Sequence, residues 1–174
     1  MIVIIACGFY YFTFPDIPRR YNQVYNMISK PIKILTLGLI IAFNSAGLPW
    51  MNNLEDAKTR AREDNKRILL VFSGSDWCRN CILLDQEVFS SPEFQELAQQ
   101  ELVLLKADFP RKKKNQLSES QQSINSKLAK TFNPTGDFPK VILMDSSEQT
   151  LLISGYQQGQ KAAFIEELST KLNP

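Results

Sequence analysis

The chain has 174 residues, which is enough for one domain of ordinary size and an extension. Hydrophobic residues make up 44% of it and charged residues 22%, as in soluble globular proteins, so a disordered or fibrous chain is excluded. The formal net charge of +2 is too small to indicate a nucleic-acid partner, and we expect none.

Cysteine and histidine usage restricts the chemistry further, because the chain has three cysteines and no histidine. Nucleophilic catalysis through a Ser-His or Cys-His pair is therefore excluded. A zinc or iron–sulfur site usually needs about four soft ligands. Cys78 and Cys81 lie close together, but Cys7 lies far upstream, in a segment that we expect the mature protein to lack. We predict no metal site.

The segment 27–46 has the parts of a secretory signal peptide in the usual order. Lys30 and Lys33 provide positive charge, residues 34–43 form an apolar run, and Ala46 is a small residue at the expected cleavage position. This run is too short to span a bilayer core of about 30 Å. The pattern therefore predicts export to the periplasm.

We expect Met27 to be the biological start and residues 1–26 to belong to a reading frame extended upstream. The mature chain would then begin at Gly47. The alternative is that the two apolar segments, residues 1–14 and 34–43, are retained as membrane anchors.

Residues 47–53 are predicted to be a linker, and residues 54–174 a single domain. Asn52 and Asn53 can cap a helix that starts at Leu54, where apolar residues repeat at helical spacing. The expected strands are residues 67–72, 102–107, 141–144 and 151–153. Further helices are expected to start at Cys78 and Ser91, to cover 128–132 and to close the chain over 161–172.

The order of these elements indicates how the strands pair. Helices connect the early strands, which should therefore be parallel with right-handed crossovers. The last two strands are joined by the polar turn 145–149 and should form an antiparallel hairpin. The sequence thus predicts an α/β domain with a central mixed sheet flanked by helices.

A basic run follows the second of these strands: Pro110 is succeeded by the four cationic residues 111–114, and then by the polar stretch 115–126. The simpler interpretation is a solvated surface loop. The alternative is a docking patch for an acidic or membrane-proximal partner. The sequence alone does not decide between them.

The pair Cys78 and Cys81 directly follows a buried strand and begins a helix. At a helix N-terminus, free backbone N–H groups and the macrodipole favour negative charge, and the cation of Arg79 acts in the same direction. Cys78 is therefore expected to form a thiolate, the species that attacks a disulfide. Cys81, one helical turn on, can then resolve the mixed disulfide.

An inert structural bridge is the alternative for this pair. A disulfide between residues three apart constrains very little chain, so its stabilising effect is small. Exported proteins that need a cross-link usually join distant segments. The spacing therefore favours a redox-active disulfide, which would be the only cofactor required.

The string Trp77-Cys78-Arg79-Asn80-Cys81 resembles the WCxxC active site of the thioredoxin superfamily. With residues 72–76 before it and 88–94 after it, the sequence is similar to a bacterial exported branch of thioredoxin-like proteins, and the resemblance covers residues 50–172. It implies a thioredoxin-like fold and a thiol–disulfide oxidoreductase, which we expect to be a monomer. Its expected partners are protein thiols and disulfides and a membrane-bound or exported redox partner.

The resemblance also implies a substrate-binding role for Phe138 and Pro139. In this superfamily the proline before the penultimate strand is cis and faces the CxxC motif, and Pro139 stands at the matching position before residues 141–144. The backbone of Phe138 would then pair with an extended substrate strand. Trp77 is expected to form a wall of the same groove.

Two departures from the family pattern concern the cysteines. Thioredoxins proper carry a buried aspartate six residues before the first cysteine, where this chain has Phe72. Proton handling and thiolate tuning must then depend on other groups, and the candidates are Asp76, Lys106 and Asp108, besides Arg79. The Arg-Asn pair inside the motif matches no familiar reductase, isomerase or oxidase, so it does not assign the direction of electron flow.

The function that these observations favour is exported disulfide exchange with protein cysteines through Cys78 and Cys81, of reductase or isomerase type rather than oxidase type. Two alternatives stay open at this point. One is a peptide-binding module that uses Trp77, Phe138 and Pro139 without turnover. The other is a maturation factor for metal- or cofactor-bearing proteins, in which the cysteine pair holds a soft metal transiently.

Overall fold

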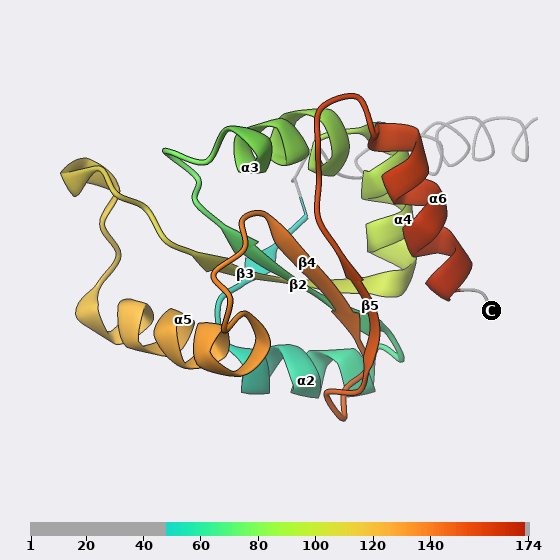
Figure 1. The fold of residues 1–174 in the computed structure, drawn as a ribbon. Helices are drawn as coiled ribbons and strands as arrows, with labels where there is room; N and C mark the ends of the chain where they lie inside the picture. The colour runs from blue at the N-terminus through green and yellow to red at the C-terminus, as the bar shows by residue number, and fades with distance from the viewer. Residues whose placement is uncertain (1–47, 173–174) are drawn as a thin grey trace, which may run out of the picture. The chain divides into compact units, whose positions relative to one another are not determined.

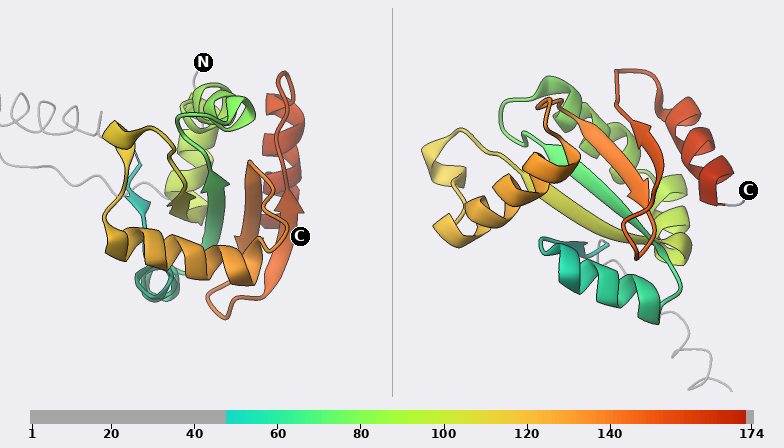
Figure 2. Two further views of the ribbon diagram at one scale, coloured as in Figure 1. Left: turned by 60° about the vertical axis from the view of Figure 1, so that its left-hand side comes forward. Right: turned by 60° about the horizontal axis from the view of Figure 1, so that its bottom comes forward.

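A computed structural model describes residues 48–172. The predicted signal peptide, residues 27–46, and the upstream residues 1–26 lie outside this range. Within it, a five-stranded sheet has the order β1-β3-β2-β4-β5 and is covered by helices on both faces (Figures 1 and 2). The strands are β1 (Trp50–Met51), β2 (Arg67–Ser73), β3 (Leu102–Asp108), β4 (Lys140–Met144) and β5 (Thr150–Ser154).

The pairing of the strands confirms the predicted mixed sheet. β1 and β2 run parallel to β3 on its two sides, whereas β4 is antiparallel to both β2 and β5. β1 lies inside the segment predicted to be a linker. Two residues are too few for a strand pattern, and only the pairing of Trp50 with Leu104 reveals this one.

The helices are α2 (Leu54–Glu63), α3 (Arg79–Leu83), α4 (Pro92–Glu101), α5 (Glu119–Phe132) and α6 (Lys161–Leu172). The π-helical turn η1 (Leu84–Phe89) continues α3, and η2 (Lys113–Asn115) is a single 3-10 turn in the connection between β3 and α5. None of the helices within residues 48–172 is both long enough and apolar enough to cross a membrane.

α5 is longer than the sequence predicted, since a helix was expected only over 128–132. Ser118 caps its N-terminus by accepting a hydrogen bond from the N–H of Gln121. Polar residues fill its first turns because only one narrow stripe is buried. That stripe includes Asn125, whose side-chain amide donates to the carbonyl of Asp108 at 2.8 Å.

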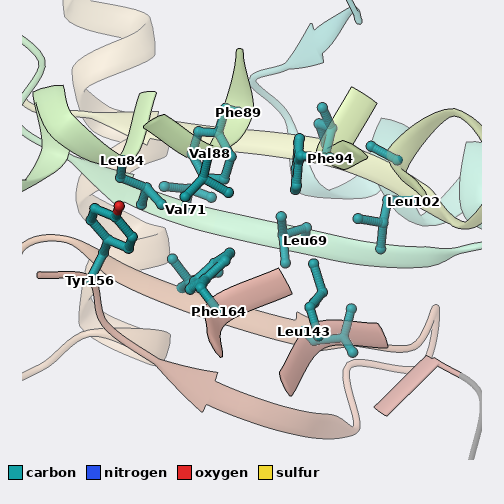
Figure 3. Close-up of a cluster of buried hydrophobic side chains, with 14 residues drawn as sticks. Leu69, Val71, Leu84, Val88, Phe89, Phe94, Leu102, Leu143, Tyr156 and Phe164 are labelled. Carbon is teal, nitrogen blue, oxygen red and sulfur yellow. The ribbon is translucent and has the colours of Figure 1, made fainter. Parts of the chain in front are cut away.

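Two hydrophobic clusters hold the layers together, one on each face of the sheet. β2 contributes to both, because successive side chains point to opposite faces: Leu69 and Val71 to one, Ile68, Leu70 and Phe72 to the other. α3, η1, α4 and α6 cover the first face (Figure 3), and α2 and α5 cover the second. This double burial explains the unbroken apolar run over β2.

A buried tyrosine connects η1 to the segment between β5 and α6. Tyr156 is 3% exposed, and its hydroxyl donates to the carboxylate of Glu87, which also accepts from the N–H of Gly159. Burial first, and the bond to Glu87 second, raise the pKa of Tyr156 to about 12. The hydroxyl therefore stays protonated near neutral pH and holds the end of the helix that begins at the cysteines.

Candidate active site

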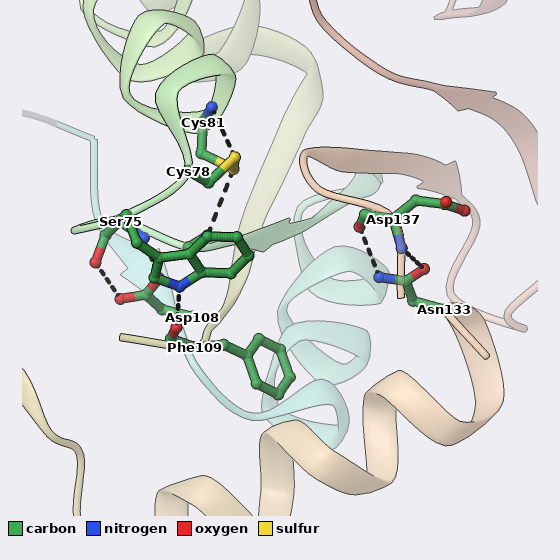
Figure 4. Close-up of a disulfide and its surroundings, with 9 residues drawn as sticks. Ser75, Cys78, Cys81, Asp108, Phe109, Asn133 and Asp137 are labelled. Atoms are coloured by element: carbon green, nitrogen blue, oxygen red, sulfur yellow. Dashed lines mark hydrogen bonds between the residues drawn. A yellow bond between two sulfur atoms is a disulfide. The ribbon is translucent and has the colours of Figure 1, made fainter. Parts of the chain in front are cut away.

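The CxxC motif follows β2 through a tight turn. The carbonyl of Gly74 accepts hydrogen bonds from the N–H of Trp77 and of Cys78, at 3.2 and 2.8 Å. Cys78 occupies the N-cap of α3 with an extended backbone. Cys78 and Cys81 form a disulfide whose Cα atoms are 5.2 Å apart (Figure 4). The predicted pair is thus joined at the start of the predicted helix.

Backbone N–H groups are the donors that reach the two sulfur atoms. The N–H of Cys81 donates to Sγ of Cys78 at 3.2 Å, and the N–H of Gly74 donates to Sγ of Cys81 at 3.4 Å. Once the disulfide is reduced, the donor at Sγ of Cys78 is placed to stabilise the attacking thiolate that the sequence predicts. Both cysteines are buried, and Cys78 is the one at the N-cap of α3, a position that suits the attacking thiol.

Phe138 and Pro139 lie at the same end of the sheet as the motif. Their peptide bond is cis, and β4 begins at the next residue, Lys140, which pairs with Phe72 near the end of β2. The ring of Phe138 meets that of Trp77 edge-on, with centroids 5.3 Å apart. The structure therefore brings together the three residues that the sequence analysis assigned to substrate binding.

A buried asparagine, which the sequence analysis missed as a site residue, fixes the turn before Phe138. Asn133 is 3% exposed and makes two hydrogen bonds to the backbone of Asp137. Its Nδ2 donates to the Asp137 carbonyl at 2.8 Å, and its Oδ1 accepts from the Asp137 N–H at 3.0 Å (Figure 4). A signal was present, because Asn133 and Pro134 directly follow the predicted helix 128–132, at a point where asparagine often bonds the backbone.

Trp77 is held on several sides. Its indole N–H donates to the carbonyl of Phe109 at 2.7 Å (Figure 4), and the guanidinium carbon of Arg111 lies 3.6 Å from the ring centroid. Its ring also covers Gly74, where a Cβ atom would lie 2.6 Å from Cζ2 of the indole. Phe109 and Arg111 belong to the connection after β3, and the sequence analysis assigned neither to the site.

Asp76 binds the same connection. Its carboxylate accepts hydrogen bonds at 2.9 Å from the N–H of Arg111, the N–H of Lys112 and Nδ2 of Asn115. The bond from Arg111 is the largest of the effects that lower the pKa of Asp76, so the carboxyl group is ionised near neutral pH. Asp108 binds the cysteine turn in a similar way, because it accepts from the N–H and the hydroxyl of Ser75 at 2.9 and 2.6 Å.

Lys106 lies on β3 beside Val71 and forms an ion pair with Asp85 at 2.8 Å, while its amine lies 4.4 Å from the ring centroid of Trp50. Among the described residues, no side-chain hydrogen bond of Lys106, Asp76 or Asp108 reaches a cysteine sulfur. Arg79, the first residue of α3, is exposed. Thiolate tuning by Arg79, Asp76 and Lys106 stays a prediction.

Phe72 occupies the position where thioredoxins proper carry an aspartate, and it is fully buried in the cluster under α2 and α5. Its side chain therefore points to the sheet face opposite α3. Within residues 48–172, no group of three acidic, cysteine or histidine side chains is arranged to hold a metal ion. Among the described residues, the hydrogen-bond donors to the two sulfur atoms are the backbone N–H groups of Cys81 and Gly74.

A disulfide at a helix N-terminus, beside a cis-proline and an aromatic wall on a mixed sheet, defines the class: a thiol–disulfide oxidoreductase with a thioredoxin fold. A family model described as thioredoxin-like matches residues 49–146, and the chain belongs to this family. Membership confirms the resemblance that the WCxxC string indicated.

Individual relatives agree with this assignment. The chain is 33% identical over 128 residues to the disulfide bond reductase DsbH of Chlamydia pneumoniae, covering 74% of this chain and 75% of that one. A solved structure of a DsbH oxidoreductase superposes with a TM-score of 0.65 at 31% identity, covering 73% and 85% of the two chains. The thiol:disulfide interchange protein DsbD of Campylobacter jejuni is 31% identical over 107 residues, which are 62% of this chain but only 17% of DsbD.

The indole ring of Trp77 packs directly against Gly74, and this contact leads to a prediction for Gly74→Ala. The added Cβ would lie 2.6 Å from Cζ2 and 2.7 Å from Nε1 of the indole, so the ring must move and lose its bond to Phe109. We expect a loss of about 1–3 kcal/mol in the free energy of unfolding, measured in urea. Reduction of a disulfide-linked peptide should slow by about tenfold or more, because the groove wall is displaced.

Gly155→Ala is the matched control. Its Cβ would lie 3.5 Å from the carbonyl oxygen of Pro139, an ordinary contact, so stability and rate should stay near those of the unaltered protein. If Gly74→Ala behaved like this control, the close packing of Trp77 over Gly74 would not matter for the site.

Proposed function

We propose that the protein is an exported reductase of disulfides in other proteins, with Cys78 as the attacking thiol and Cys81 as the resolving thiol. The observation that carries the proposal is the place of Cys78 at the N-cap of α3, where its Sγ receives the N–H of Cys81, next to the paired rings of Trp77 and Phe138. The 33% identity to a disulfide bond reductase supports the reductase direction over isomerase or oxidase.

The reaction follows from the two thiols. The Cys78 thiolate, stabilised by the N–H of Cys81, attacks one sulfur of the substrate disulfide and releases the other as a thiolate. Cys81, whose Sγ receives the N–H of Gly74, then attacks Sγ of Cys78. The second substrate sulfur leaves as a thiolate, and Cys78 and Cys81 end as a disulfide. Two electrons pass to the substrate, and a separate exported or membrane-bound dithiol partner must return them.

Phe138 and Pro139 support the binding step. Asn133 bonds both the carbonyl and the N–H of Asp137, so it holds the turn that leads into the cis bond between Phe138 and Pro139. An extended substrate segment would pair with the backbone of Phe138 while its cysteine lies at Cys78. Trp77, held by Phe109 and Arg111, would line the segment on its other side.

Cysteine variants test the assignment of roles. Cys81→Ser should react with a disulfide-linked peptide and stop at the mixed disulfide with Cys78, because no resolving thiol remains. Cys78→Ser should form no adduct. Both products can be read by mass spectrometry of the intact protein. A stable adduct on Cys81 in Cys78→Ser, at the rate of the other variant, would reverse the roles. If Cys78→Ser left both the binding of the peptide and the phenotype of cells that carry the variant unchanged, a binding module without turnover would be favoured instead.

The direction of electron flow is tested by the equilibrium between the reduced and oxidised protein in glutathione buffers. We expect a reduction potential nearer that of thioredoxin, about −270 mV, than that of a strong oxidant, about −120 mV. Fluorescence of Trp77, which adjoins the disulfide, can follow the transition. A potential at the oxidising end would contradict the reductase proposal and favour a disulfide donor or isomerase.

The proposal that the protein is exported rests on the signal-peptide pattern of residues 27–46. N-terminal sequencing of the protein recovered from the periplasm is expected to give Gly47 as the first residue. Recovery of a chain that still begins at Met1 would contradict both the proposed start and the cleavage, and would favour anchoring by the apolar segments.

A further inference from the structure

The basic loop, defined as Arg111–Lys114, has no role in the thiol chemistry described so far. It carries four consecutive cationic residues, all of them exposed. Among residues 48–172, none of these four side chains takes part in an ion pair. The carboxylate of Asp76 at the base of the loop opposes these four positive charges with one negative charge, so the loop keeps a net positive charge.

The position of the basic loop is set by the residues just before Cys78. Asp76 accepts the N–H groups of Arg111 and Lys112 and the side-chain amide of Asn115, so both ends of the loop are bound to one carboxylate. Trp77 donates to the carbonyl that precedes the loop by two residues, and Arg111 stacks on its indole. These contacts hold the basic loop next to the cysteine turn.

The two carboxylates beside the basic loop, Asp76 and Asp108, both accept hydrogen bonds from within the protein. Asp76 is occupied by backbone N–H groups of the loop itself, and Asp108 is occupied by Ser75. Hydrogen bonding to Arg111 lowers the pKa of Asp76, so this contact is present at neutral pH and is lost as the pH falls through the lowered pKa. The cationic ends of the lysines are left free for an outside partner.

We propose that the basic loop is a docking surface for an acidic segment of the substrate protein next to its reactive disulfide. The inference rests on the proposed function, since it concerns the same substrates. Arg111 lies on the face of Trp77, the residue that directly precedes Cys78. An extended chain advances about 3.3 Å per residue, so we expect carboxylates a few residues from its cysteine to lie along the side of the site that carries the basic loop.

A protein segment fits this surface better than a membrane does. The loop is continuous, through Arg111 and Trp77, with the wall that contacts the substrate. An occupant of the loop is therefore an extension of whatever occupies the groove. Charge complementarity at such a rim acts mainly on the association rate and weakens with salt.

The test compares two disulfide-linked peptides that share one cysteine and differ only in having several glutamates or several glutamines around it. The reduced full-length protein should reduce the glutamate peptide about tenfold faster or more at low ionic strength. The ratio of the two rate constants should approach one at about 0.5 M salt, where charges are screened within a few ångströms.

Two triple variants with the same change in net charge identify the surface. Lys112→Gln, Lys113→Gln and Lys114→Gln together should bring the ratio at low salt close to one. Lys127→Gln, Lys130→Gln and Lys171→Gln, which alter exposed lysines on α5 and α6, should keep the ratio of the unaltered protein. A ratio of rate constants close to one in both triple variants would show a general charge effect and overturn the inference.

The remaining outcomes separate the inference from the proposed function. Equal rates for both peptides with the unaltered protein would overturn the docking inference but not the proposed reductase function. If neither peptide were reduced, both the docking inference and the proposed function would be overturned. The first triple variant is also tested on phosphatidylcholine vesicles that contain phosphatidylglycerol. Weaker vesicle binding with an unchanged peptide ratio would overturn the inference in favour of a membrane surface.

Discussion

Strand β2 is hydrogen-bonded along both edges, to β3 and to β4, and it is buried on both faces. Every segment of the candidate site is placed by these pairings. The cysteine turn follows β2, the basic loop follows β3, and the cis bond immediately precedes β4. Because β3 is parallel to β2 and β4 is antiparallel, the end of β2, the end of β3 and the start of β4 lie together. Three connections distant in sequence therefore surround one disulfide.

Sequence reasoning was sufficient where the signal was local. The apolar run of β2, the cysteine pair after it and the hairpin of β4 and β5 each lie within one short stretch, and their structures agree with expectation. The grouping of Trp77 with Phe138 came from family resemblance rather than from any pattern in the residues.

The contacts that sequence reasoning missed depend on tertiary structure. Asp76 was considered for a role beside the cysteines, and its bonds to Arg111 and Lys112 join residues 35 and 36 positions away. α5 was shortened in the prediction because its buried stripe contains Asn125, a polar residue satisfied by the carbonyl of Asp108. In both cases a polar side chain forms a hydrogen bond with a residue distant in sequence, and no periodicity in the sequence predicts that bond.

The basic loop is attached to the cysteine turn by side chains, and it does not belong to the sheet. Its lysines can therefore be replaced without disturbing the strands or the disulfide, provided that the backbone bound by Asp76 keeps its course. Selection of partners and the chemistry of electron transfer thus reside in separate parts of one rim. Over evolutionary time, descendants of this chain could acquire new clients by changing a few surface residues while retaining the same redox centre.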